Sequence, residues 1–330
     1  MKKIFILALV LLGLALSSCA PKAREAESFA MNTIVRQTVY SANEDITQKV
    51  NEIINGLDQS LSRSVESSDI YKINTSSAGA QVEVAEETAT LLARCLQEAR
   101  ASDGAYNPAL GSLIKLWGFG SGNEKVPAAA EIEKALKNCN YNNVEVKGTS
   151  VTKQGEQIDL GGSAKGYALD ILRDMLKANG VESALVSIGG SILAMGEKPA
   201  GKWKIGIRDP EGGEYDSLGT IELKDICVST SGAYERGFTE DGVYYHHILD
   251  TKTGYPANSD LVSVTVAGQD GLQTDIYSTA LFVLGLEKGL ELAEDVELAA
   301  LFVTKKQEVY KTAAFDELNF ELTGEEYSLA

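Results

Sequence analysis

Gly161 and Gly162 separate a short apolar segment from an amphipathic helical pattern, and this junction limits how the middle of the chain can fold. The residues at 157–160 predict a strand, and the periodicity of 164–179 predicts a helix that stops at Gly180. Glycines let the backbone approach a ligand, and a helix start offers unpaired N–H groups to an anion. Lys165 lies in the first helical turn, where the helix dipole disfavours a cation, so it calls for a counter-charge such as a phosphate.

Asp275, Ser278 and Thr279 form a second pattern with chemical meaning. Their i, i+3, i+4 spacing places three side-chain oxygens on one helix face. A carboxylate with two hydroxyls suits Mg²⁺, which completes its shell with water and substrate phosphates. Each pattern also has a structural explanation, because the glycines could serve strand–helix packing and Asp-x-x-Ser-Thr could cap a helix. Together the two patterns indicate a diphosphate and its metal.

The first 18 residues are typical of a lipoprotein signal peptide. Lys2 and Lys3 precede an apolar run of about a dozen residues, too short for a membrane-spanning helix of about 20. The segment 16–19 is typical of a lipobox, which predicts that Cys19 becomes the lipidated first residue and that 19–28 form a polar tether. We therefore expect a cell-envelope protein that is lipid-anchored to a membrane and faces the extracytoplasmic side.

The mature chain is strongly acidic. Loss of residues 1–18 removes two lysines and no acid, so the formal net charge moves from −17 to −19. This charge argues against nucleic acid or anionic lipid as a partner and leaves the lipid anchor as the membrane contact.

The remaining pattern mixes helices with short alternating strands. Helical periodicity occurs at 47–61, 87–101, 130–137, 164–179, 272–284 and 286–293. Strand patterns occur at 35–40, 143–146, 150–152, 184–188, 203–207, 219–223, 243–249 and 261–267. The elements come in runs and hairpins without strict βαβ alternation, which predicts an α+β fold with mixed, largely antiparallel sheets and packed helices. Roughly 310 residues allow two lobes or one elaborated domain.

Three motifs resemble the signatures of the ApbE family: Asp159 to Asp170, Thr274 to Ala280, and the His-Ile-Leu-Asp segment that begins at His247. The resemblance covers nearly the whole mature chain in the same order. It also includes Met31-Asn32-Thr33, the segment 68–74, and the segments 104–108 and 116–119.

The resemblance implies one ApbE-like domain over 29–330 and the activity of a magnesium-dependent FAD:protein FMN transferase. Such an enzyme takes FAD as substrate and moves FMN onto a threonine or serine of a target redox protein, with release of AMP. The resemblance places metal ligands on Gly162, Asp275, Ser278 and Thr279. Contacts to the flavin nucleotide fall on Met31, Ala105, Tyr106, Asn107, Asp159, Lys165, Arg236 and Leu249.

His246 and His247 are the only histidines. On a strand they face opposite sides, and His247 matches the family's His-x-x-Asp, so we expect it to handle the proton while Asp275 serves the catalytic metal. The alternative is a histidine bonded only to backbone. An FAD diphosphatase, or a flavin-binding lipoprotein without catalysis, are the alternative functions.

Three positions depart from the family pattern. Asn32 replaces a glycine in a tight turn, and Ser64 stands where many members have a tyrosine that stacks on the flavin. The stacking face would then be missing or supplied by Tyr71 or Tyr106. Ser278 replaces a carboxylate of some members, which should weaken the metal site without abolishing it.

Overall fold

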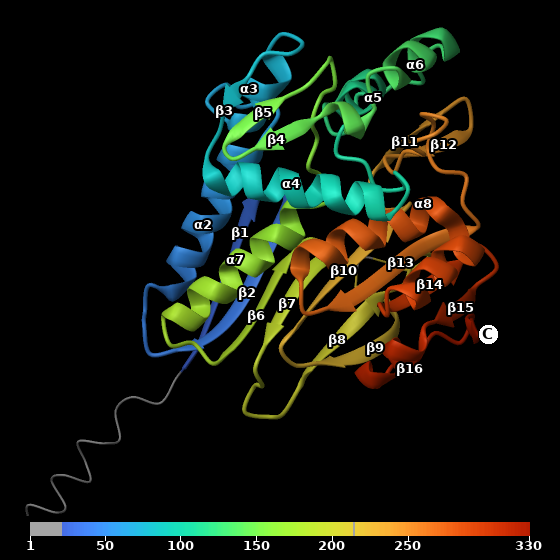
Figure 1. The fold of residues 1–330 in the computed structure, drawn as a ribbon. Coiled ribbons are helices and arrows are strands. Elements are labelled where there is room, and N and C mark those ends of the chain that lie inside the picture. The colour runs from blue at the N-terminus through green and yellow to red at the C-terminus, as the bar shows by residue number, and fades with distance from the viewer. Residues whose placement is uncertain (1–21, 214) are drawn as a thin grey trace, which may run out of the picture.

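The computed structural model describes residues 22–213 and 215–330, and its centre is a nine-stranded sheet (Figure 1). Neighbouring strands are antiparallel except for the last pair, β15 and β17. The strands, in spatial order, are β1 (Lys22–Ala30), β2 (Thr33–Ser41), β6 (Ser183–Ile188), β7 (Ser191–Met195), β10 (Ile226–Gly232), β13 (Leu261–Gly268), β14 (Ala299–Thr304), β15 (Glu308–Lys311) and β17 (Ser328–Leu329). The predicted α+β architecture is confirmed.

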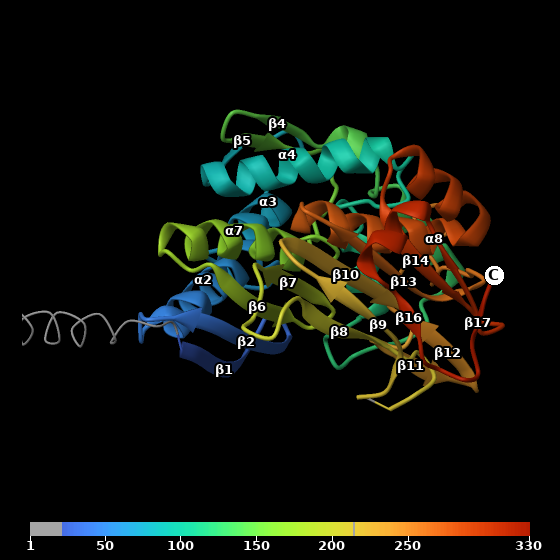
Figure 2. The same cartoon turned by 90° about the horizontal axis from the view of Figure 1, so that it is seen from below.

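Helices cover one face of this sheet. Seen from below, α7 and α8 lie against the strands and α4 lies beyond them (Figure 2). The long helices are α2 (Ile46–Leu61), α4 (Glu86–Ala101), α7 (Ala164–Ala178) and α8 (Gly271–Asp295). Their apolar faces form the main core with the sheet. None of the helices in the described part of the chain is long and apolar enough to span a membrane.

A smaller sheet packs on the opposite face, and a second apolar core, which includes Trp203, Leu223 and Phe315, fills the space between the two sheets. Its strands are β8 (Trp203–Arg208), β9 (Ser217–Leu223) and β16 (Glu321–Leu322), and the short helix η2 (Ala313–Leu318) flanks them.

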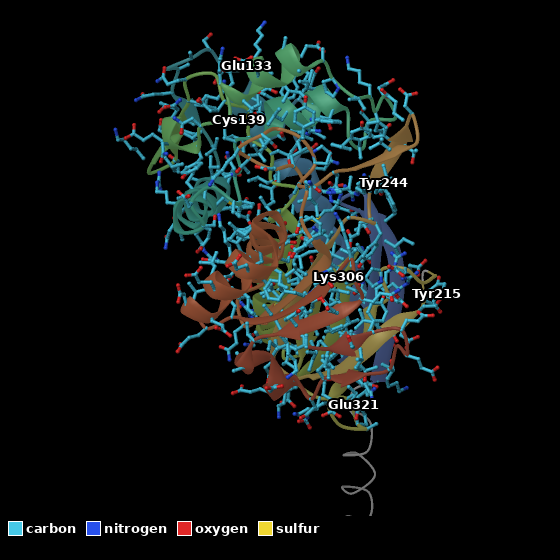
Figure 3. All side chains as sticks on the ribbon, turned by 90° about the vertical axis from the view of Figure 1, so that its right-hand side faces the viewer. Glu133, Cys139, Tyr215, Tyr244, Lys306 and Glu321 are labelled. Atoms are coloured by element: carbon cyan, nitrogen blue, oxygen red, sulfur yellow. The ribbon has the colours of Figure 1, made fainter. Side chains whose placement is uncertain are left out.

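The remaining elements gather at one end of the molecule. Tyr244, Glu133 and Cys139 lie at that end, opposite Glu321 (Figure 3). These elements are α3 (Asp69–Thr75), α5 (Gly111–Trp117), α6 (Ala129–Leu136), η1 (Tyr141–Asn143), the sheet of β3 (Val82–Glu83), β5 (Ser150–Thr152) and β4 (Glu145–Lys147), and the hairpin of β11 (Gly237–Glu240) and β12 (Val243–His246).

Four expectations need correction or refinement. The tether predicted over 19–28 is wrong from Lys22 onward, because these residues pair with β2 as strand β1; Cys19 and the signal peptide lie outside the described residues. The strand predicted over 243–249 ends at His246. The two helices predicted at 272–284 and 286–293 form one kinked helix, with Gly285 at φ +78° between them.

The segment 157–160 does not form the predicted strand. Its backbone groups bind other partners: the Asn74 amide accepts from Ile158 N at 2.6 Å and donates to Ile158 O at 2.8 Å. Asp159 N donates to Pro108 O, and Gly111 N donates to Gln157 O. The Asn74 amide thus makes the two hydrogen bonds to Ile158 that a neighbouring strand would make. The alternation of apolar residues cannot reveal a contact between residues so far apart in the chain.

Candidate functional site

The N-terminal turns of α7 and α8 cross in direct backbone contact. A Cβ atom added to Gly166 would lie 2.1 Å from Gly271 O and 2.6 Å from Asp275 Cβ, and one added to Gly271 would lie 2.4 Å from Gly166 O. Real Cβ atoms do not approach other atoms so closely, so only glycine permits this crossing. The contact places two helix N-termini side by side.

Each of these helices caps the other. Asp170 on α7 accepts from Gly271 N at 2.8 Å and Leu272 N at 3.0 Å. In return, Asp275 Oδ2 on α8 accepts from Gly166 N at 2.9 Å. The exchange satisfies N–H groups that a helix start leaves open. It also fixes the Asp275 carboxylate at the start of α7.

Lys165 faces this carboxylate. Its Nζ lies 3.4 Å from Asp275 Oδ1 and 3.4 Å from Gly161 O, while Asp275 is only 3% exposed. Ser191 Oγ on β7 is a further neighbour of Oδ1 at 3.4 Å. The counter-charge that Lys165 requires is therefore present in the protein itself, and a phosphate is not needed to explain the lysine.

Hydroxyl groups surround the same point. Ser231 Oγ on β10 lies 2.8 Å from Ser278 Oγ and 3.1 Å from Thr279 Oγ1. Ser278 is fully buried and also donates to Asp275 O at 2.9 Å. A Cβ on Gly162 would lie 3.3 Å from Thr279 Oγ1. The structure thus brings together all four predicted metal-ligand positions, with Ser231 and Ser191 as members that sequence reasoning missed.

The donor set fits a hard divalent cation. Asp275 supplies one buried carboxylate, Thr279 and Ser278 supply hydroxyls, and the Gly161–Gly162 turn supplies backbone carbonyls. Across residues 22–213 and 215–330, no three His, Cys, Asp or Glu side chains form a possible metal cluster. A metal here would therefore take much of its shell from backbone, water and substrate oxygens.

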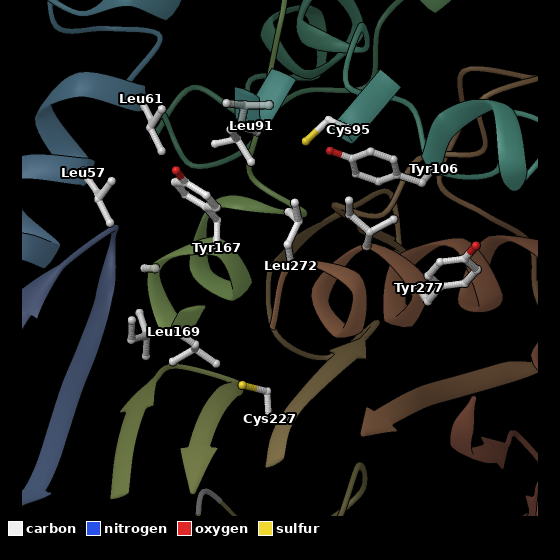
Figure 4. Close-up of a cluster of buried hydrophobic side chains, with 14 of the residues drawn as sticks. Leu57, Leu61, Leu91, Cys95, Tyr106, Tyr167, Leu169, Cys227, Leu272 and Tyr277 are labelled. Atoms are coloured by element: carbon white, nitrogen blue, oxygen red, sulfur yellow. The ribbon is translucent and has the colours of Figure 1, made fainter. Parts of the chain in front are cut away.

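The predicted contact loop at Ala105, Tyr106 and Asn107 lies behind Gly162. Tyr106 is 4% exposed, its ring edge faces Gly162, and its hydroxyl points toward Cys95 (Figure 4). The Asn107 side chain donates to Cys139 O at 2.7 Å and accepts from Ala109 N at 2.8 Å. Tyr106 therefore cannot offer an open ring face on which a flavin could stack. Tyr71 is half-buried, so part of its side chain is open to solvent.

The other predicted residues form a second wall. Met31 and Asn32 both have positive φ in the turn between β1 and β2, a turn geometry that Asn tolerates well. Arg236 Nη2 donates to Asn32 O at 3.1 Å, and Leu249 is buried with Trp117 and Phe119. A cavity of about 270 Å³ lies here, lined by Asn32, Phe119, Gly120, Glu124, Arg236 and Gly237.

The two histidines face different surroundings, as predicted. His246 Nε2 lies 3.1 Å from Ala257 O, and its ring packs edge-on against Phe282 in the core. His247 Nδ1 lies 3.1 Å from Arg236 O. Because a carbonyl oxygen only accepts, Nδ1 carries the proton and Nε2 keeps a free lone pair.

Burial lowers the pKa of His247 to about 4. The hydrogen bond to Arg236 O raises the pKa, whereas the positive charges of Arg236 and Lys165 lower it further. The ring is therefore neutral at pH 7, in the state that a general base needs. We expect an NMR titration of the ring protons to give a midpoint near 4 for His247. His247→Gln assigns the signal, and a midpoint at or above 6 would contradict the shift.

Known proteins resemble this chain over most of its length. The sequence model of the ApbE family matches residues 31–302. The chain is 35% identical over 339 residues to the FAD:protein FMN transferase of Treponema pallidum, with 94% of this chain and 93% of that one covered.

Solved structures give the same result. The ApbE protein from Thermotoga maritima is 38% identical, with a TM-score of 0.85 over 91% of this chain and 100% of that one. The flavinyl transferase ApbE of Pseudomonas stutzeri is 36% identical, with a TM-score of 0.82 over 91% of this chain and 97% of that one. The family model matches most of the chain and both solved structures share its fold, so the chain belongs to the ApbE family.

Proposed function

We propose that this chain is an FAD:protein FMN transferase that attaches FMN to a threonine or serine hydroxyl of a target redox protein. The observation that carries the proposal is the convergence of Asp275, Thr279, Lys165 and the Gly161–Gly162 turn where α7 and α8 cross. A cation, a buried carboxylate and hard oxygens at two helix N-termini suit a diphosphate. The relatives named as FAD:protein FMN transferases support FAD as its source.

The reaction breaks the phosphoanhydride bond between the two phosphates of FAD and forms a phosphoester bond to the target hydroxyl. The target hydroxyl oxygen bonds to the phosphorus of the FMN half of FAD, the bond from that phosphorus to the AMP phosphate breaks, and AMP leaves with the electron pair. The hydroxyl proton passes to Nε2 of His247. Such transfers depend mainly on positioning and charge neutralisation.

A bound Mg²⁺, held by Asp275, Thr279, Ser278 and the Gly162 carbonyl, would neutralise charge on the diphosphate oxygens. Lys165 would add a second positive charge beside them. Arg236 and the turn at Met31 and Asn32 would close the opposite side of the FAD site, with Asp159 and Leu249 completing its walls.

The transferase needs a base and a flavin-binding protein does not, and we propose that Nε2 of His247 is that base. We expect His247→Ala to lower flavinylation of an acceptor threonine by on the order of a hundredfold, while FAD affinity changes only a few-fold. Mass spectrometry of the acceptor and FAD fluorescence measure the two quantities. Wild-type rates in the mutant would remove His247 as the base.

The same experiment separates the alternative function. Wild-type protein that releases AMP and free FMN with Mg²⁺, but never labels an acceptor, would be an FAD diphosphatase in which water replaces the hydroxyl. Binding of FAD with neither product would indicate a flavin-binding lipoprotein.

We also propose that the protein is lipid-anchored through Cys19 and acts in the cell envelope, on the extracytoplasmic side of a membrane. The lipobox supports this placement. We expect Cys19→Ala to move the protein to the soluble fraction or to leave its signal peptide uncleaved, as fractionation and intact mass will show. An unchanged, processed protein in the membrane fraction would contradict lipidation.

A further inference from the structure

Arg63 forms an ion pair with Asp159, at the start of the glycine turn. The sequence alone did not predict this ion pair. Arg63 Nε lies 3.1 Å from Asp159 Oδ2, and the two side chains are 33% and 15% exposed. Arg63 lies just after α2, in a tight segment where Ser64 N donates to Ser62 Oγ and Ser68 Oγ donates to Ser62 O. The guanidinium is thus presented by an ordered turn.

The two oxygens of Asp159 have separate tasks. Oδ1 accepts from Gly161 N at 2.9 Å, while Oδ2 binds Arg63. The backbone before this point is fixed by Asn74 and Pro108. Gly161 itself has no side chain, so the bond from its N–H to Asp159 is a main constraint on its conformation.

Arg63 fixes the rotation of the Asp159 carboxylate. Without the ion pair, the Asp159 carboxylate can rotate about χ2, a torsion that is only weakly restrained. This rotation weakens the hydrogen bond from Gly161 N. The Asp159 charge would also face the proposed diphosphate without compensation. Both effects act on the turn whose Gly161 O lies 3.4 Å from Lys165 Nζ.

We propose that Arg63 is a positioning residue for FMN transfer, which acts through Asp159 to hold the Gly161–Gly162 turn. The proposal rests on the proposed function for the reaction it serves. Residues that orient a site in this way typically contribute about tenfold to hundredfold to activity.

The test is a double-mutant cycle of Arg63→Met and Asp159→Asn, read by FAD turnover and by hydrogen exchange of the peptide 157–166. We expect Arg63→Met to lower kcat/KM by about tenfold or more and to speed exchange in that peptide, while the strand 261–268 is unchanged. In the Asp159→Asn background, Arg63→Met should lower kcat/KM by less than about a further twofold. Arg63 acts only through Asp159, so the effects of the two substitutions are not additive. Arg63→Lys should recover most of the loss.

Arg24→Met is the matched control, since Arg24 pairs with Glu44 at 3.3 Å and is similarly buried, at 25% exposure. It should leave turnover and the exchange of 157–166 unchanged. Unchanged exchange in Arg63→Met would overturn the proposal, as would a full and additive loss in the Asp159→Asn background, which would indicate direct contact with FAD. Wild-type protein that neither transfers nor hydrolyses FAD would refute the proposed function, whereas hydrogen exchange would still decide the role of Arg63.

Discussion

Asp275→Asn should reduce FAD turnover by about a thousandfold or more, the largest loss from any single change in the site. The new amide keeps the shape of the carboxylate and can still accept from Gly166 N through its oxygen. Its NH₂ group, however, would then face the Lys165 ammonium, which now lies 3.4 Å from Asp275 Oδ1. The substitution therefore removes the charge that holds Lys165 and the proposed Mg²⁺.

Ser278→Ala provides the comparison on the same helix. The Ser278 hydroxyl is one of three neighbouring hydroxyls, and water can replace it at a metal. We expect a loss of about tenfold or less, largely restored by added Mg²⁺. Turnover of FAD to AMP over a range of Mg²⁺ concentrations, together with melting temperatures, measures both variants. Equal losses that Mg²⁺ does not restore would show that both changes act by disturbing the fold.

The parts of the site that the sequence predicted correctly are local. The helix from Ala164 was predicted within one residue at its end, because its apolar period and Gly180 lie in one segment. The common face of Asp275, Ser278 and Thr279 follows from helix geometry alone. Both are consequences of spacing within a few turns.

The missed features depend on residues far apart in the chain. The contact of Gly166 with Gly271, the cap from Asp170 and the pair of Arg63 with Asp159 each join segments about a hundred residues apart. No local pattern encodes them. The alternative in which Tyr106 supplies the stacking face is excluded by a feature of the same kind, since its burial behind Gly162 depends on how two loops pack.

The edge of the fold shows how a polar composition can mislead. Residues 22–28 are a mixture of charged and small side chains, which favoured a tether, yet they form an edge strand that pairs with β2 along its whole length. Charged side chains are a common protection for such strands against unwanted pairing. The strand therefore begins only three positions after Cys19, and a lipid anchor there would leave little free chain.

Gly166→Ala should damage both stability and catalysis, because the crossing of α7 and α8 has no room for a methyl group. The new Cβ would lie 2.1 Å from Gly271 O and 2.6 Å from Asp275 Cβ, so one helix must move. Overpacking of this kind costs about 3 kcal/mol or more of the free energy of unfolding. A shift of about 1 Å in Asp275 relative to Lys165 lowers turnover by about a hundredfold. A smaller folded fraction of the protein lowers the measured turnover further.

Gly56→Ala is the control for this change. Gly56 is an exposed residue within α2, and a Cβ there meets no atom within 4 Å. Alanine should therefore stabilise the protein by about 0.5 to 1 kcal/mol through the helix backbone, with unchanged turnover. Urea unfolding and FAD turnover measure both variants. A Gly166→Ala protein with wild-type stability and turnover would show that the two helices can accommodate a methyl group at their crossing. The backbone contact between Gly166 and Gly271 would then not determine the position of Asp275.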